Sequence, residues 1–265
     1  YATTNNNFTV SGAATIAADT TVNTDTGGGN ISFASIANGA AFDMALTSGT
    51  GTVAASGAVS VTDLTLNTTG GSTFGGNVTV NDLIVTAAAN AVTLQGSANT
   101  FAAAVDFANT AGTITFGHAT SDQSTFDAGV SVSGNQAVAL SGSIITTDDT
   151  VNFGTGAMTL GAASTVTTGS SAVTFGGAVN GGQTLAVNST GATVFSAAVG
   201  GTTALTSLTT NAGGSVSLQN VTTTGVQTYG ENATLDGTYT TTNSTFTASG
   251  TTTLADATTV TTGSG

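Results

Sequence analysis

The chain has 265 residues and a net charge of −13, because it carries 13 acidic residues and no Lys or Arg. A chain without fixed positive charge cannot neutralise a phosphate backbone or an anionic membrane surface, so nucleic-acid binding and membrane-surface binding are excluded. No uninterrupted apolar stretch reaches the roughly 20 residues that membrane insertion needs. The lack of Cys excludes disulfides and zinc–thiolate sites.

Short runs that alternate apolar and polar residues follow one another along the chain. Each run predicts a strand with one buried and one exposed face, and turn signals rich in Gly and Asn separate the runs. No segment shows a sustained helical period, so almost no helix is expected. In chain order, the clearest strands are predicted at 64–66, 78–80, 114–116, 130–132 and 216–218.

A longer period is superimposed on this alternation. The block from Val173 to Leu185 matches the block from Thr193 to Leu205 with an offset of 20, as Phe, then Val four residues on, then Leu six further. Repeat periods of this size with strand-type units indicate a solenoid. Related blocks begin at Phe74, Phe101 and Phe126, and the series Phe153, Phe175, Phe195 and Leu218 continues the period.

These patterns predict an all-β fold, a right-handed parallel β-solenoid of about 12 coils with about 20–23 residues each. We expect one continuous solenoid over 1–265, in which Phe175 and Phe195 stack at equivalent inward positions. The lack of Pro agrees with this fold, because each central strand needs its N–H groups. The alternative is a tandem pair of antiparallel β-sandwich domains, whose strands also turn over every few residues.

The two ends of the chain resemble each other. Residues 1–12 read YATTNNNFTVSG and residues 239–250 read YTTTNSTFTASG, so 239–265 is interpreted as the beginning of a second copy of 1–29. Either the chain belongs to a tandem array, or its terminal blocks are equivalent coils. Tyr1 is not an initiator Met and no signal-peptide pattern opens the chain, which indicates a mature or internal fragment. Neither end carries a polar capping block, which predicts head-to-tail self-association or continuation into tandem repeats.

The blocks VTFGGAVNGGQTLAV, TVFSAAVGGTTALTSL and QTYGENATL resemble the repetitive passenger regions of large bacterial surface proteins. The families concerned are the filamentous-haemagglutinin-like and autotransporter-type β-helix adhesins. The resemblance implies an exported, extended and non-enzymatic surface structure, and it carries over no catalytic residues.

Few residues offer chemistry. His118 is the only histidine. The acidic pair Asp148 and Asp149 would point to opposite faces if it lay in a strand, and we interpret it as a solvated turn with local hydrogen bonds. We therefore predict no enzyme and no catalytic, cofactor-binding or metal site. The remaining Asp residues show no fixed phase in the period. Structural calcium is kept as an alternative, since oxygen ligands are plentiful.

Thr-x-Thr pairs could build a flat hydroxyl face if they stacked coil on coil. They occur at 113/115, 165/167, 222/224, 245/247, 251/253 and 259/261. Eight Asn-x-Ser/Thr sequons begin at Asn7, Asn30, Asn67, Asn77, Asn188, Asn220, Asn232 and Asn243, which composition alone nearly explains.

The sequence therefore predicts a structural rod at the cell surface or outside the cell, as part of a fibre, filament or large adhesin. Its partners would be further copies or repeats, together with a glycan or host receptor that the sequence does not identify. The alternative function is a module on a Thr-rich face that binds ice or glycans.

Overall fold

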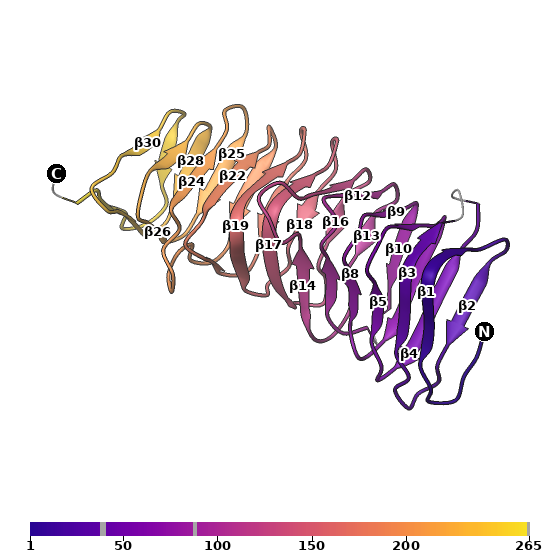
Figure 1. Cartoon of the computed structure of the whole chain (residues 1–265). Coiled ribbons are helices and arrows are strands. Elements are labelled where there is room, and N and C mark those ends of the chain that lie inside the picture. Colours follow the sequence, from indigo (N-terminus) through magenta and orange to yellow (C-terminus); the bar gives the residue numbers. More distant parts are fainter. Residues whose placement is uncertain (38–40, 87–88, 264–265) are drawn as a thin grey trace.

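The computed structural model describes residues 1–37, 41–86 and 89–263, so the last two residues of the predicted second copy lie outside it. Within these ranges every regular element is a β-strand, and none is a helix. Figure 1 shows an elongated stack of coils with the two termini at opposite ends. The predicted all-β parallel β-solenoid of about 12 coils is confirmed.

Each coil contributes strands to three faces, here called faces 1, 2 and 3 in chain order. Face 1 contains β1 (Phe8–Thr15), β3 (Ile31–Ala37), β5 (Val53–Ala55), β8 (Ser72–Phe74), β11 (Val92–Leu94), β14 (Thr113–Phe116), β17 (Ala137–Ile145), β19 (Met158–Thr167), β21 (Val179–Asn180), β26 (Val221–Thr223), β29 (Thr238–Thr241) and β32 (Thr259–Thr261). Isolated bridges at Val199 connect β21 to β26.

Face 2 begins with the second halves of the long strands β1, β3, β17 and β19, which run on from face 1. It also contains β6 (Val59–Ser60), β9 (Val78–Val80), β12 (Ala98–Phe101), β15 (Gln123–Phe126), β22 (Thr184–Asn188), β24 (Ser207–Thr210), β27 (Gln227–Tyr229) and β30 (Phe246–Ala248).

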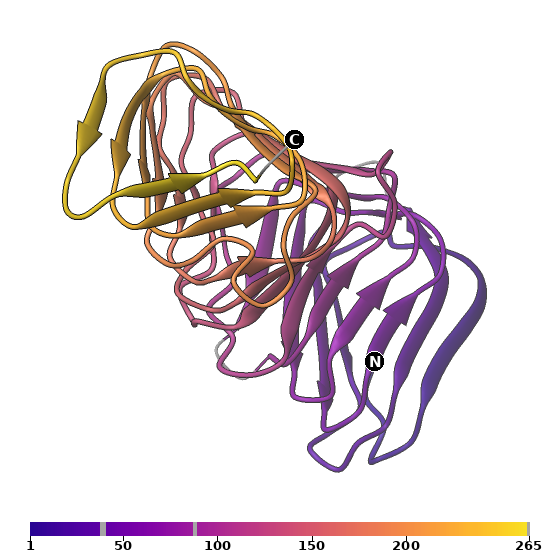
Figure 2. The ribbon, with the colours of Figure 1, turned by 90° about the vertical axis from the view of Figure 1, so that its left-hand side faces the viewer.

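Face 3 contains β2 (Thr20–Asn23), β4 (Met44–Gly49), β7 (Asp63–Thr68), β10 (Asp82–Val85), β13 (Val105–Asp106), β16 (Val130–Ser131), β18 (Val151–Asn152), β20 (Val173–Phe175), β23 (Ala192–Phe195), β25 (Ser215–Leu218), β28 (Asn232–Leu235) and β31 (Thr252–Leu254). A bridge between Val85 and Phe107 joins its first four strands to the rest. In Figure 2 the stack is turned so that its C-terminal end, in yellow, faces the viewer, and the last coils show strands running in different directions on different faces.

All the strand pairings of the described residues are parallel, each strand with its equivalents in neighbouring coils. The alternative of antiparallel sandwiches is therefore wrong. The coils are less uniform than predicted: register partners lie 17 residues apart at Val216 and Ala233, and 25 apart at Val105 and Val130. Corner loops of different lengths absorb this variation, because strands alone must stay in register.

The interior is a column of inward-facing Val, Leu, Ile and Phe side chains. Phe175 and Phe195 are register partners, both are buried, and their rings stack with centroids 4.5 Å apart and an interplanar angle of 2°. This confirms their predicted equivalence. Phe101 and Phe126 stack in the same way on face 2, with centroids 4.7 Å apart.

Two details of the predicted period are wrong. Phe74 lies on face 1, whereas Phe101 lies on face 2 and pairs with Val80. Leu185 pairs with Leu208 and not with Leu205, because the loop before β24 is three residues longer than the matched blocks imply. Similar letters at similar spacing therefore do not guarantee the same face when corner lengths vary.

The two similar terminal blocks form strands at the same sequence spacing, but equivalent strands lie on different faces. In the first block β1 begins on face 1 with Phe8, and in the last block Phe246 begins β30 on face 2. Likewise the Thr-Thr-Val motif ends on face 3 at Val22 and on face 1 at Val260. The second block is thus rotated by one face relative to the first.

Candidate functional site

Asn and Asp side chains join one coil to the next by accepting a hydrogen bond from its backbone, an arrangement here called a clamp. Asn77 Oδ1 accepts the backbone N–H of Ala98 at 3.0 Å, and Asn232 Oδ1 accepts that of Thr251 at 3.0 Å. These bonds satisfy N–H groups at strand ends where the ladder alone does not. The same arrangement recurs at Asn7, Asn30, Asp63, Asp148, Asn180 and Asn220. Five of the eight sequon asparagines therefore have a structural role.

Four aspartates form a row along one edge of face 3: Asp19, Asp43, Asp63 and Asp82. Each precedes or begins a paired strand at the same register position. The expectation that the Asp residues share no phase is wrong for these four, because unequal coil lengths hid their alignment. Burial and the neighbouring Asp63 charge raise the pKa of Asp82, while the Leu83 backbone N–H lowers it.

The carboxylates of this acidic row bond to backbone N–H groups of the neighbouring coil. Among the residues that the structure describes, no three His, Asp or Glu side chains group so that they could hold a metal ion. Asp43 N donates to Asp19 Oδ1 at 3.0 Å and Asp82 N donates to Asp63 Oδ1 at 3.1 Å, so these carboxylates serve the coil-to-coil clamp.

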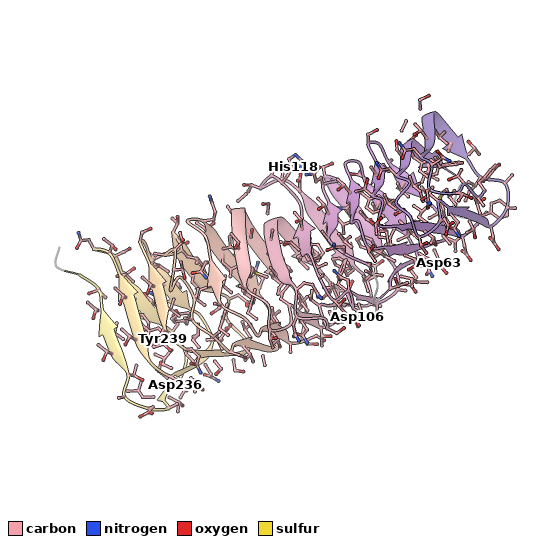
Figure 3. All side chains as sticks on the ribbon, turned by 90° about the horizontal axis from the view of Figure 1, so that it is seen from below. Asp63, Asp106, His118, Asp236 and Tyr239 are labelled. Carbon is pink, nitrogen blue, oxygen red and sulfur yellow. The ribbon has the colours of Figure 1, made fainter. Side chains whose placement is uncertain are left out.

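His118 lies in the loop between β14 and β15, on the opposite long edge of the rod from Asp63 and Asp106 (Figure 3). Its Nδ1 is 2.8 Å from Asp122 Oδ2, and the same oxygen accepts the backbone N–H groups of His118 and Ala119. Asp122 is buried and the His118 ring is exposed. The pair closes a local turn. Sequence reasoning treated His118 alone and missed Asp122, although the spacing of four residues was a usable signal.

The acidic pair Asp148 and Asp149 lies in a corner between β17 and β18. Asp148 Oδ1 accepts the Ser170 N–H at 2.8 Å, and the Asp149 carbonyl accepts the Thr146 hydroxyl at 2.6 Å. Both residues thus hold the corner together, as turn aspartates commonly do.

The predicted Thr-x-Thr pairs are distributed over all three faces. Pairs 113/115 and 259/261 lie on face 1, 165/167 on face 2, and Thr253 on face 3. A common flat hydroxyl face therefore does not form from them. A smaller threonine patch exists on face 1 near the C-terminus, made by Thr222, Thr238, Thr240, Thr259 and Thr261.

The end coils expose apolar side chains. In the coils between them, a neighbouring coil covers the equivalent side chains. At the N-terminal end, a hollow of about 260 Å³ is lined by Tyr1, Phe8, Val10 and Ile16, among others. At the C-terminal end, Leu254 is 62% exposed and Val260 is 45% exposed. Among the described residues, three of the five exposed large hydrophobic side chains lie at the two ends.

Comparison with known proteins finds no relative of this chain. In the described part of the chain there is no helix of a length and apolarity suited to crossing a membrane. No protein family model, no curated protein and no solved structure matches this chain.

Proposed function

We propose that this solenoid is a non-enzymatic structural rod of an extracellular fibre, filament or large surface adhesin. Its task is mechanical: parallel ladders on three faces run along the whole stack, and the number of coils sets its length. A surface of Thr, Ser and Asn with few charges limits nonspecific binding. Trypsin-type proteases find no Lys or Arg to cleave.

The observation that carries the proposal is the apolar character of both end coils. Each end exposes side chains that elsewhere stack on an equivalent coil, together with strand edges whose N–H and C=O groups are open for pairing. We propose that further coils cover these ends, supplied by a second copy head to tail or by tandem repeats. A heterologous contact of this kind extends into a filament when it does not close.

The test is assembly of the 265-residue chain in solution. We expect light scattering and electron microscopy to find linear head-to-tail oligomers, with more assembly at high salt because the copies repel at a net charge of −13. Leu254→Asp places a charge in the C-terminal end coil and should abolish assembly.

The matched control is Ile84→Asp, which puts the same charge at a 41% exposed position on the side of the rod. This variant should assemble like the unchanged chain. A chain that stays monomeric at all salt concentrations, or equal loss in both variants, would contradict end-to-end assembly.

The threonine patch supports the second candidate function, binding of ice or a glycan. Its two short rows place Thr238 beside Thr259 and Thr240 beside Thr261 on adjacent strands. Replacing Thr240 and Thr261 with Val would keep the shape and remove hydroxyl groups. Loss of ice-growth inhibition or of glycan-array binding in that variant would support this function over the rod alone.

A further inference from the structure

Glu231, the only glutamate of the chain, is buried in the wall of the solenoid. It lies at the corner between β27 and β28 and is 3% exposed. Neither carboxylate oxygen has a partner at full hydrogen-bond geometry; the buried Thr210 hydroxyl lies close enough to favour the charged form but does not form a well-aligned bond. Buried polar groups are nearly always paired, so this corner needs a chemical explanation.

Local geometry accounts for the burial of Glu231. Two residues, Gly230 and Glu231, join β27 to β28, whereas four residues join β24 to β25 in the coil before. Gly230 packs against that coil so closely that a Cβ would lie 2.8 Å from the Ala212 nitrogen. On the other side, a Cβ at Gly250 would lie 2.4 Å from the Glu231 carbonyl oxygen. The short corner is therefore sealed between its two neighbours.

The surroundings of Glu231 provide no counter-charge. Of the elements packed around it, β24, β28 and the corners 211–214 and 249–251 carry no ionisable side chain. β27 contributes Tyr229, whose hydroxyl donates to Gln227 Oε1 at 3.2 Å. The chain has no Lys or Arg to supply a charge from elsewhere. A buried carboxylate without a partner is strongly unfavourable, whereas its protonated form is tolerated.

We propose that Glu231 is a proton-binding site that holds the C-terminal coils closed. With a proton bound, the neutral carboxyl remains inside the corner and β24, β27 and β30 stay stacked. When the proton leaves, the charge draws the corner toward water and loosens these coils. This device acts within one chain and does not depend on end-to-end assembly.

The direction of the pH effect follows from linkage. Burial raises the pKa of Glu231 above its ordinary value of 4.5, and the nearby Thr210 hydroxyl lowers it by less. The folded protein thus binds this proton more tightly than the unfolded chain does. Stability is fully present below the unfolded pKa and is lost as pH rises through the folded pKa. Within that window one proton changes the unfolding equilibrium by up to about tenfold per pH unit.

The direct test uses the fact that Glu231 is the only glutamate. Labelling with side-chain ¹³C-glutamate gives one carboxyl signal, whose chemical shift is followed from pH 3 to pH 9 in the full chain, the range that brackets the ordinary value of 4.5. A midpoint clearly above this ordinary value supports the proposal, and an ordinary midpoint overturns it. This measurement needs no variant.

The second test compares Glu231→Gln with Asp256→Asn. Both replace an ionisable carboxyl group with a neutral amide, but Asp256 is exposed in the next coil. We expect Glu231→Gln to abolish the loss of hydrogen-exchange protection at the Tyr229 and Ser249 amides as pH rises, and Asp256→Asn to retain it. Equal pH dependence in the two variants would overturn the proposal.

Discussion

Two regions of the rod share one backbone scheme but differ in what fills them. The aromatic stack on face 3, made by Phe153, Phe175 and Phe195, consists of apolar rings with centroids 5.1 and 4.5 Å apart. The tyrosine cluster, made by Gln227, Tyr229 and Tyr239, is equally buried but full of polar atoms.

The hydrogen bonds of the tyrosine cluster explain how it tolerates burial. Tyr239 Oη donates to the Leu218 carbonyl at 2.8 Å and accepts the Asp236 N–H at 3.0 Å. Gln227 Nε2 donates to the Thr240 carbonyl at 2.9 Å. The comparison teaches that the interior of a coil can be filled by apolar rings or by polar side chains. The stability of the aromatic stack depends on filling the interior volume, whereas that of the tyrosine cluster depends on a hydrogen-bond partner for each polar group.

The largest loss of stability is expected when a ring is removed from the aromatic stack. Phe175→Ala should lower the free energy of unfolding by about 3–5 kcal/mol, because it leaves a cavity between two stacked rings. Thermal and denaturant unfolding followed by circular dichroism would measure this loss.

Thr174→Ala is the matched control, since Thr174 is the neighbouring residue on the outward side of β20. It should change stability by less than about 0.5 kcal/mol. If Phe175→Ala cost no more than this control, the stack would not hold these coils together.

The next largest effect concerns a single oxygen of the cluster. Tyr239→Phe keeps the ring but removes the hydroxyl, so the Leu218 carbonyl and the Asp236 N–H lose a partner. We expect a loss of about 1–3 kcal/mol in the free energy of unfolding. Tyr1→Phe, at a residue that is 78% exposed, should be neutral. Equal stability of the two variants would contradict this prediction and show that the bond between Asp236 N–H and the Leu218 carbonyl, 3.0 Å long, is sufficient on its own.

The cluster also predicts a difference at high pH. Burial raises the pKa of Tyr239 to about 12, and it raises the pKa of Tyr229 well above its ordinary value of 10.0. A group with a raised folded pKa stabilises the fold below its unfolded pKa, so this stability is lost as pH rises from about 10 through about 12. Absorbance of tyrosinate should show that Tyr229 and Tyr239 ionise only above their ordinary value of 10.0. Ionisation of either residue at that ordinary value would refute this prediction.

The fold could be predicted from the sequence because the alternation of apolar and polar residues and the turn signals repeat many times. A mistake in placing one strand therefore does not change the predicted fold. Phe175 and Phe195 were placed correctly because two blocks with equal corner lengths followed each other. Leu185 was not, because the loop before β24 is longer. Face assignment depends on corner lengths, and no residue pattern in this chain specifies them.

The candidate functional residues were harder to predict. Asp19, Asp43, Asp63 and Asp82 come into one row only when unequal coils are aligned, and Asp122 had to be paired with His118 across a turn. Glu231 carried no sequence signal at all, since its burial results from a corner that is two residues shorter than the one before it.

The smallest loss of stability is expected for the Asn clamps, and it should be of the same order in both regions. Asn180 Oδ1, near the aromatic stack, accepts the Thr202 N–H at 2.9 Å. Asn232 Oδ1, near the tyrosine cluster, accepts the Thr251 N–H at 3.0 Å. Each Asn→Ala change should cost about 0.5–1.5 kcal/mol of unfolding free energy, with Asn180 at the upper end because its Oδ1 also accepts the Thr203 N–H at 3.2 Å.

Replacement by Asp separates the clamp from other roles of these side chains. Asp keeps the acceptor oxygen, and the chain itself uses Asp63 and Asp148 in the same position relative to the next coil. Asn180→Asp and Asn232→Asp should therefore recover most of the stability lost with Ala, apart from a small cost for added charge that salt screens. If Asp failed to restore stability in one region only, the interior filling and not the clamp would determine how firmly that region's coils are joined.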